Sequence, residues 1–183
     1  MPTGLTLLAF ALFFLGDWND WKWERAALRF CFPAGFLALA ASAALSVGRA
    51  KPFSGAARAV CALLGLVSLA LLVYTLFFAL SAGDAYVRQA DKRPVCTSGV
   101  YALCRHPGVW WLFFLYLSLR GALGVPLPAG LLATALNVLL VLFEDRAVFP
   151  ARLAGYEAYR RTTPFLIPTG ASLRAAFSRS IQP

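Results

Sequence analysis

The chain contains the apolar segment AVCALLGLVSLALLVYTLFFALSA (residues 59–82), which carries no charged side chain. A helix needs about 20 predominantly apolar residues to cross the hydrocarbon core of a bilayer, so this segment is long enough to cross with some tilt. Shorter apolar runs occupy residues 4–16, 30–47, 109–119 and 131–143. We therefore expect an all-α integral membrane protein, a bundle of about five transmembrane helices.

The composition favours the same class. Hydrophobic residues make up 60% of the 183 residues, and the mean hydropathy is +0.70, which exceeds what a soluble core of this size can hide. The net charge of +9 comes from basic residues at the ends of the apolar runs, as membrane-flanking charges do, so we expect a lipid bilayer and no nucleic acid as partner. The four cysteines lack metal-ligand spacing and the chain has a single histidine, so no zinc site and no other metal is expected.

The distribution of basic residues predicts the orientation. With five spans, the connections at residues 17–29 and 83–105 and the C-terminal tail share one side, and they hold 3, 4 and 6 of the 17 Lys and Arg residues. The other side holds the remaining four, Arg49, Lys51, Arg58 and Arg120. The positive-inside rule then places the N-terminus outside and the tail in the cytoplasm of an inner or plasma membrane.

The N-terminal part carries two packing signals. Trp18, Trp21 and Trp23 alternate with basic residues, which is typical of headgroup anchors, with a substrate-binding aromatic cluster as the alternative. Small residues recur at four-residue spacing in the second span, at Ala34, Ala38 and Ser42, which lets helices approach closely within the bundle or in a dimer.

The only histidine lies in the segment TSGVYALCRHPGVWW (residues 97–111). Proline suits the first position of a helix, so we expect His106 near the N-cap of a helix that opens with Pro107. Tyr101 and Arg105 are four residues apart, and a short helical turn would place both on one side. A phenol, a guanidinium and an imidazole at a helix N-terminus favour an anionic ligand group.

Two adjacent acids, Glu144 and Asp145, follow the last apolar run. Adjacent helical residues point about 100° apart, so we do not expect the two to act as one paired acid site. Asn137 and Thr134 continue a polar stripe from Glu144 into the helix, where polar groups tend to face partners or cavities. Structural hydrogen bonding of the stripe, and a simply solvated helix end, are the alternatives.

The tail is expected to continue the fifth helix until Pro150 ends or kinks it near Phe149. An amphipathic cytoplasmic helix follows, with Tyr156 and Tyr159 on its apolar face. We expect a single domain with three N-terminal spans in residues 1–82, a ligand-binding half with a helical hairpin in 83–168, and a loosely ordered tail in 169–183.

These segments resemble the membrane methyltransferases of the isoprenylcysteine carboxyl methyltransferase family, with the phospholipid N-methyltransferases as more distant kin. The matching residues are SGVY (98–101), RHP (105–107), the two acids, GYEAY (155–159) and PFLIP (164–168). The resemblance covers about the last half of the chain. It departs from the family at Gly108-Val109, where the family often has a small residue and then Tyr, and at Asp145, where it usually has a second Glu.

The resemblance implies S-adenosylmethionine as cofactor. This ligand needs an Arg or a helix N-terminus for its carboxylate, acids for its amine or ribose, and aromatic faces near its sulfonium. Besides Trp110, the expected cofactor-binding residues are Tyr101, Arg105, His106, Pro107, Glu144, Asp145 and Tyr159. Arg152 and Arg160 are the candidates to hold an acceptor carboxylate at the catalytic position.

We therefore expect a methyltransferase that acts on a lipophilic or prenylated small acceptor, with carboxyl O-methylation as the activity that the resemblance implies. One alternative is an NADPH-dependent membrane reductase related to the sterol reductases. Another is a non-enzymatic membrane subunit or transporter. A transporter should carry ionisable residues near mid-membrane, and none of the five runs contains one. The oligomeric state has no signal in the sequence.

Overall fold

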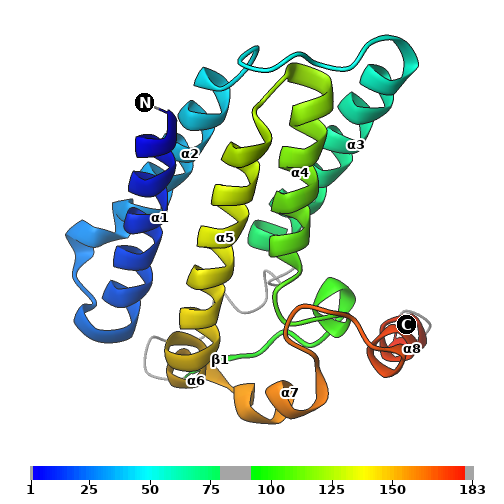
Figure 1. The fold of residues 1–183 in the computed structure, drawn as a ribbon. Helices are drawn as coiled ribbons and strands as arrows, with labels where there is room; N and C mark the ends of the chain where they lie inside the picture. The colour runs from blue at the N-terminus through cyan, green and yellow to red at the C-terminus, as the bar shows by residue number, and fades with distance from the viewer. Residues whose placement is uncertain (1, 79–91, 180–183) are drawn as a thin grey trace.

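A computed structural model describes residues 2–78 and 92–179. Five helices run roughly side by side, and apart from one pair of two-residue strands the regular structure in this part of the chain is helical (Figure 1). The helices are α1 (Pro2–Trp18), α2 (Cys31–Leu45), α3 (Gly55–Val73), α4 (Pro107–Leu123) and α5 (Leu127–Phe143). The expected all-α class is confirmed. Asp84, Arg88 and Asp91, which belong to the connection at residues 83–105, lie outside the described residues.

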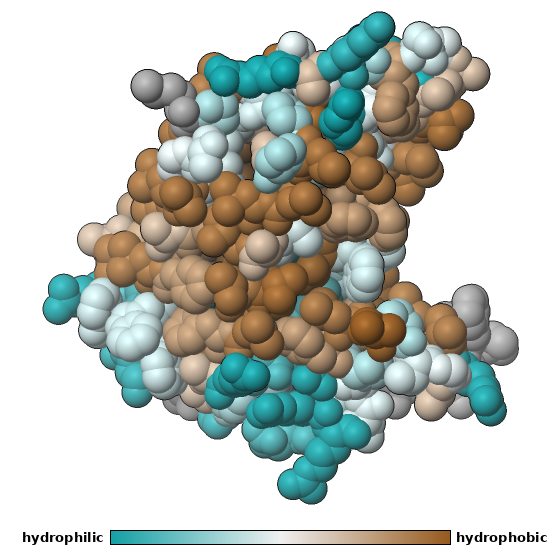
Figure 2. Space-filling view, viewed as in Figure 1, coloured by the Kyte–Doolittle hydropathy of each residue, from teal (hydrophilic) through white to brown (hydrophobic). Residues whose placement is uncertain are grey.

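Three helical stretches in the described part are long and apolar enough to cross a membrane, namely Ala26–Leu45, Gly55–Phe77 and Leu127–Arg152. Apolar side chains on them face outward, among them Leu37 at 73% exposure and Leu66 at 66%. Figure 2 shows the result, an apolar band between two polar ends. Water would not tolerate so large an apolar surface, whereas lipid does. The surface is therefore compatible with a bilayer environment.

The helices form two close pairs joined by a central helix. α1 packs along α2, α3 packs along α4, and α5 lies between the pairs and contacts α1 and α4 (Figure 1). The buried core comes from α1, α4 and α5 and from the turn between α4 and α5. Its residues are Ala9, Phe10, Phe13, Leu112, Tyr116, Val125, Ala133 and Leu140. We call the end where α4 begins and α5 finishes the motif end, and the opposite end the hairpin end.

The small-residue seam of α2 faces α1, so it serves packing within the bundle. A Cβ on Gly35 would lie 2.6 Å from the ring of Phe13, and the Ser42 hydroxyl donates to the Pro2 carbonyl at 2.7 Å. The Ser42 hydroxyl also lies 2.7 Å from that of Thr6. Ala34 of the predicted seam is exposed, because the contact with α1 passes through Gly35 instead.

The hairpin between α4 and α5 is tighter than the sequence predicts. α4 continues through Gly121 and ends at Leu123, and Gly124 follows in the left-handed conformation with φ +69°. The connection from α2 to α3 lies against this turn, where the Ala50 N–H donates to the Gly124 carbonyl at 2.8 Å. The four basic residues of the expected outer side, Arg49, Lys51, Arg58 and Arg120, all lie near this hairpin end.

At the motif end, α5 passes into a π-helical turn, η6 (Glu144–Val148), and then α6 (Phe149–Arg152). The chain stays helical through Pro150, so the fifth helix does not end near Phe149 but changes there from η6 to α6. Pro150 has no N–H to donate, and the π-helical turn directly before it, closed by the Phe149 N–H donating to the Glu144 carbonyl, accommodates the proline. Strand β2 (Leu153–Ala154) then pairs in parallel with β1 (Arg93–Pro94), and α7 (Tyr156–Thr162) follows.

The segment after residue 169 differs from the expected loosely ordered tail. Helix α8 covers Gly170–Arg179. Its start is capped reciprocally, since the Thr169 N–H donates to the Ser172 hydroxyl at 2.9 Å and the Ser172 N–H donates to the Thr169 hydroxyl at 3.2 Å. The capping box explains the helix: serine takes the place that Glu or Gln usually has in that motif.

Shorter helical turns complete the connections. η1 (Asn19–Trp23) and η2 (Ala26–Phe30) link α1 to α2 at the motif end. η3 (Tyr74–Phe78) extends α3, and η5 (Gly99–Ala102) precedes α4. The Asn19 side chain braces the first connection, because it accepts from the Arg25 N–H at 2.8 Å and donates to the Arg25 carbonyl at 3.2 Å.

Candidate functional site

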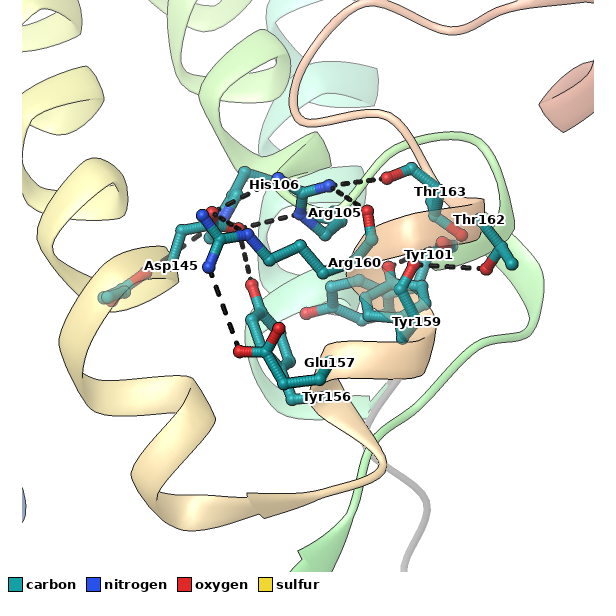
Figure 3. A network of polar contacts seen from close by, with 11 residues as sticks. Tyr101, Arg105, His106, Asp145, Tyr156, Glu157, Tyr159, Arg160, Thr162 and Thr163 are labelled. Carbon is teal, nitrogen blue, oxygen red and sulfur yellow. Dashed lines mark hydrogen bonds and ion pairs between the residues drawn. The ribbon is translucent and has the colours of Figure 1, made fainter.

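Two segments forty residues apart in sequence meet at the motif end through Arg105 and Asp145 (Figure 3). The Arg105 Nε donates to Asp145 Oδ1 at 2.7 Å, and Nη2 donates to Oδ2 at 3.2 Å. The remaining Nη1 donates to the carbonyls of Arg160 at 3.0 Å and Thr163 at 2.6 Å. Burial alone would lower the pKa of Arg105, but the contacts with Asp145 raise it overall, so the guanidinium stays charged. A bidentate pair of this kind fixes geometry as well as charge.

His106 lies between the two adjacent acids. Its Nε2 is 3.3 Å from Asp145 Oδ1, and its Nδ1 is 3.8 Å from Glu144 Oε2. The ring stacks on Phe149 with centroids 5.7 Å apart, and only 6% of the residue is exposed. Burial lowers the pKa of His106 despite the contact with Asp145. The imidazole is therefore neutral near pH 7, and the Nε2–H is placed to donate to Asp145.

Asp145 is the centre of the network. Besides Arg105 and His106, the Tyr156 hydroxyl donates to Oδ1 at 2.6 Å, and the Arg160 Nε lies 3.6 Å from Oδ2. Burial and the hydrogen bond to Asp145 raise the pKa of Tyr156, so the phenol keeps its proton. The anionic group that the Arg-His-Pro sequence predicts at the start of α4 is thus met by the protein's own Asp145.

The segment 164–168 is held against the start of α4 through its main chain. The Arg105 N–H donates to the Pro164 carbonyl at 2.9 Å, and the His106 N–H donates to the Phe165 carbonyl at 3.3 Å. The Trp110 indole N–H donates to the Leu166 carbonyl at 2.8 Å. Trp110 therefore positions this segment, and its polar edge is occupied.

Tyr101 and Arg105 point in different directions, contrary to the expectation of one shared side. η5 ends at Ala102, so no continuous turn connects the two residues. The Tyr101 hydroxyl donates to the Thr75 carbonyl at 3.0 Å, and the Tyr159 hydroxyl donates to the Tyr101 carbonyl at 2.7 Å. Burial raises the pKa of Tyr101 to about 12, so this phenol stays neutral.

A pocket of about 450 Å³ lies beside the network, between η5, α7 and α8. Its lining includes Tyr159 and Thr163, which connect it to the contacts of Tyr101 and Arg105 described above. The volume falls in the range of roughly 300–1,000 Å³ that small-molecule sites occupy. The complete lining is Thr97, Ala102, Gly155, Ala158, Tyr159, Thr162, Thr163, Ala171, Ser172 and Ala175.

Most predicted site residues meet at the motif end. Arg105, His106, Glu144, Asp145 and Arg160 lie in one network, Tyr101 and Tyr159 adjoin it, and Pro107 is the first residue of α4. The side chains of this network contact one another, and the pocket of about 450 Å³ lies beside them. Arg152 is not brought to this network. It pairs instead with Glu24 of the connection between α1 and α2, at 2.5 Å.

Sequence reasoning missed two residues of the site, Tyr156 and Asp17. Tyr156 belongs to the GYEAY segment, but nothing in that pattern indicates which tyrosine reaches Asp145. Asp17 directly follows the first apolar run and is 5% exposed, and it lies where the end of α1 packs against Glu144 and the rest of η6. The only signal for Asp17 was a carboxyl placed where a membrane helix ends, a position that a solvated residue also occupies.

Comparison with known proteins adds no relative. No family model matches the chain, and no curated protein or solved structure matches it. Arguments about activity therefore depend on the residues and geometry of the motif end.

The chemistry of this site is that of binding and positioning. In the described part of the chain, no three His, Cys, Asp or Glu side chains are grouped as a metal site would require. The network fixes α7 and the segment 164–168 against α4, and the neighbouring pocket offers hydroxyl groups and small apolar side chains. Such a surface suits a small organic ligand.

Proposed function

We propose that the protein is an S-adenosylmethionine-dependent methyltransferase that acts on a lipid-soluble small acceptor at the motif end. The supporting observation is the position of Tyr159, which belongs to the GYEAY segment, contacts Tyr101 of the SGVY segment, and lines the pocket of about 450 Å³. Segments that are separate in the sequence thus contribute to one hollow large enough for a nucleoside.

The pocket lining suggests which part of S-adenosylmethionine would lie in the pocket and which part beside it. All the lining residues are uncharged: threonines, one serine, one tyrosine, alanines and a glycine. They suit the adenosine part, with hydroxyl oxygens that can accept hydrogen bonds from the ribose and small alanine side chains that leave room for the base. The charged amino-acid end of the donor is then expected to reach the neighbouring rim, where Glu144 lies.

The donor supplies a methyl group on a positive sulfur, and the protein's task is to orient two reactants and exclude water. A carboxylate or thiolate acceptor needs no strong base. The Arg105–Asp145 pair acts here as a positioning element, since it holds α7 and the segment 164–168 in place. Carboxyl O-methylation of a prenylated acceptor is the activity that the family resemblance favours, with Arg160 near the acceptor carboxylate.

Five membrane spans and an outer N-terminus are part of this proposal. α1 and α4 each have 17 residues, which at 1.5 Å per residue gives about 26 Å, close to the bilayer core of about 30 Å. α1 continues into η1, which adds length at the motif end. Most basic residues flank this end, so the positive-inside rule places it in the cytoplasm, where S-adenosylmethionine is available.

Calorimetry of the purified, detergent-solubilised protein tests the proposal with three ligands: S-adenosylmethionine, S-adenosylhomocysteine and NADPH. Ala158→Trp fills the pocket, and Ala151→Trp adds the same side chain at an exposed position of α6 that does not line it. We expect S-adenosylhomocysteine to bind wild type and Ala151→Trp alike, and Ala158→Trp at least tenfold more weakly. Binding of NADPH alone would replace the methyltransferase by a reductase, and binding of none of the three would favour a non-enzymatic subunit.

A further inference from the structure

A buried and a partly buried carboxyl group lie together beside the network, Asp17 at the end of α1 and Glu144 after the end of α5. Asp17 is 5% exposed and the Glu144 side chain 17%. The end of α1 packs against η6, which brings the two carboxyl groups close to each other. The Asp17 oxygen Oδ2 is fully buried and has no hydrogen-bond partner among the described residues.

This pair has no cationic partner in the described part of the chain apart from His106, whose Nδ1 lies 3.8 Å from Glu144. That imidazole is neutral near pH 7, as argued above. Asp145, by contrast, contacts both Arg105 and Arg160. Burying an acceptor oxygen without a hydrogen-bond donor costs folding free energy, and enclosing two acids without a cation costs more. The Asp17–Glu144 pair is therefore left with acceptor capacity that a positively charged donor would satisfy.

Aromatic rings flank the pair on both elements. Trp18 follows Asp17 and Phe143 precedes Glu144, and the two rings stack with centroids 6.1 Å apart. Trp21 meets the edge of Phe143 at 5.8 Å. The faces of such rings attract organic cations, and Lys22 already places its ammonium 3.9 Å from the centre of the Trp21 ring. Trp18 is 41% exposed, so this ring of the cluster lies at the surface of the protein.

We propose that Asp17 and Glu144, with Trp18 and Phe143 beside them, form a binding site for an organic ammonium group. The carboxyls accept hydrogen bonds from the ammonium, and the ring faces contact its carbon substituents. Two sources supply this chemistry at a membrane surface: the amino-acid end of the methyl donor, and the amine headgroup of a lipid. The first source rests on the proposed function, whereas the second does not.

Two ligand pairs that differ only in the amine separate these sources. The first pair is S-adenosylhomocysteine and its analogue in which hydrogen replaces the amino group. The second is a short-chain phosphatidylethanolamine and a short-chain phosphatidylethanol, in which hydrogen replaces the amino group. Affinities are measured by calorimetry on the full chain in a neutral detergent, for wild type, Asp17→Asn and Glu144→Gln. The matched controls are Asp20→Asn and Glu157→Gln, which remove exposed carboxylates nearby.

We expect wild type to prefer the amine-bearing member of at least one pair by about tenfold or more, as charge-assisted hydrogen bonds do. Asp17→Asn and Glu144→Gln remove this preference, and both controls keep it. Trp18→Leu should reduce it severalfold, with Trp23→Leu as its control, so the test does not depend on one substitution folding. The pair that shows the preference identifies the source.

The inference is overturned if wild type shows no amine preference in either pair, or if the preference survives both Asp17→Asn and Glu144→Gln. If S-adenosylhomocysteine binds without an amine preference and the lipids show none, the inference fails while the proposed function stands. If S-adenosylhomocysteine does not bind wild type at all, the proposed function fails, and the lipid pair alone decides the inference.

Discussion

Asp145 is the residue on which the motif end depends most, because it accepts hydrogen bonds from Arg105 and Tyr156 and lies against His106 and Arg160. The Arg105 and Asp145 side chains are only 9% and 6% exposed. Removing one partner of a buried ion pair leaves an uncompensated charge, at a typical cost of about 3–5 kcal/mol. Asp145→Asn should therefore lower the free energy of unfolding by roughly this amount.

Denaturant unfolding in detergent micelles measures this cost. Glu157→Gln is the matched control, since Glu157 is 63% exposed and lies 3.9 Å from the partly exposed Arg160. Surface pairs of this kind contribute about 0–1 kcal/mol. Equal effects of the two substitutions would show that Asp145 does not organise the motif end.

His106 gives stability a specific pH dependence. Burial lowers its pKa in the folded protein, so below about pH 6.5 the unfolded chain binds a proton that the folded chain resists. The contribution of His106 is therefore complete above pH 6.5 and is lost as the pH falls from there toward the folded pKa. The charged neighbours are Asp145, Glu144 and Arg105. Between pH 8 and pH 5, the melting temperature of His106→Gln should fall less steeply than that of wild type. An unchanged slope would assign the pH dependence of stability to other groups.

The structural role of a single residue can be predicted from the sequence only where local backbone geometry determines it. Pro107 opens α4 as expected, because a proline suits the first helical position whatever surrounds it. Asp17 could not be predicted, since its burial depends on α5 finishing beside α1. The ion pair between Arg152 and Glu24 could not be predicted either. The direction of α6 after the π-helical turn decides that Arg152 lies beside Glu24.

At the scale of elements, the hairpin between α4 and α5 depends on Gly124. Its φ is +69°, and a Cβ there would lie 2.0 Å from the Ala50 carbonyl oxygen. Gly48 is the matched control, with φ +72° but open space around the added carbon. Gly48→Ala should cost about 1 kcal/mol from backbone strain alone, and Gly124→Ala clearly more, measured by denaturant unfolding. Equal costs would mean that the contact with Ala50 relaxes freely.

Helix α8 depends on its cap. Thr169→Ala removes the hydroxyl that accepts from the Ser172 N–H, which typically costs about 1 kcal/mol. Amide exchange in the first turns of α8 should accelerate about fivefold as a result. Thr162→Ala serves as control, because the Thr162 hydroxyl donates to carbonyls of its own helix, α7. Unchanged exchange in Thr169→Ala would mean that contacts with η5 hold α8 without the cap.

The elements show where sequence patterns succeed and fail. Apolar runs located the five long helices, because burial or lipid contact requires such runs. α8 was missed because its cap is Thr-x-x-Ser and its composition resembles a solvated tail. One member of the small-residue seam was wrong: Ala34 is exposed and Gly35 takes its place, whereas Ser42 lies against α1 as predicted.

At the scale of the whole molecule, the separation of basic residues predicts a topology that labelling can test. Lys51 lies at the hairpin end and Arg161 on α7 at the motif end, and both are exposed. In a background with Cys61 and Cys96 replaced by Ser, Lys51→Cys should react with an impermeant maleimide added to intact cells. Arg161→Cys should react only after the cells are opened. The reverse pattern would place the motif end outside, away from the cytoplasmic methyl donor.

The most direct measurement is transfer of a labelled methyl group from S-adenosylmethionine to lipid-soluble material. Purified wild type, Ala158→Trp and Ala151→Trp are incubated with a membrane lipid extract, and the apolar products are identified by mass. The methyltransferase proposal predicts a labelled product with wild type and Ala151→Trp, and its loss when the pocket beside Tyr159 is filled. No labelled product with wild type, or equal labelling with Ala158→Trp, would contradict it.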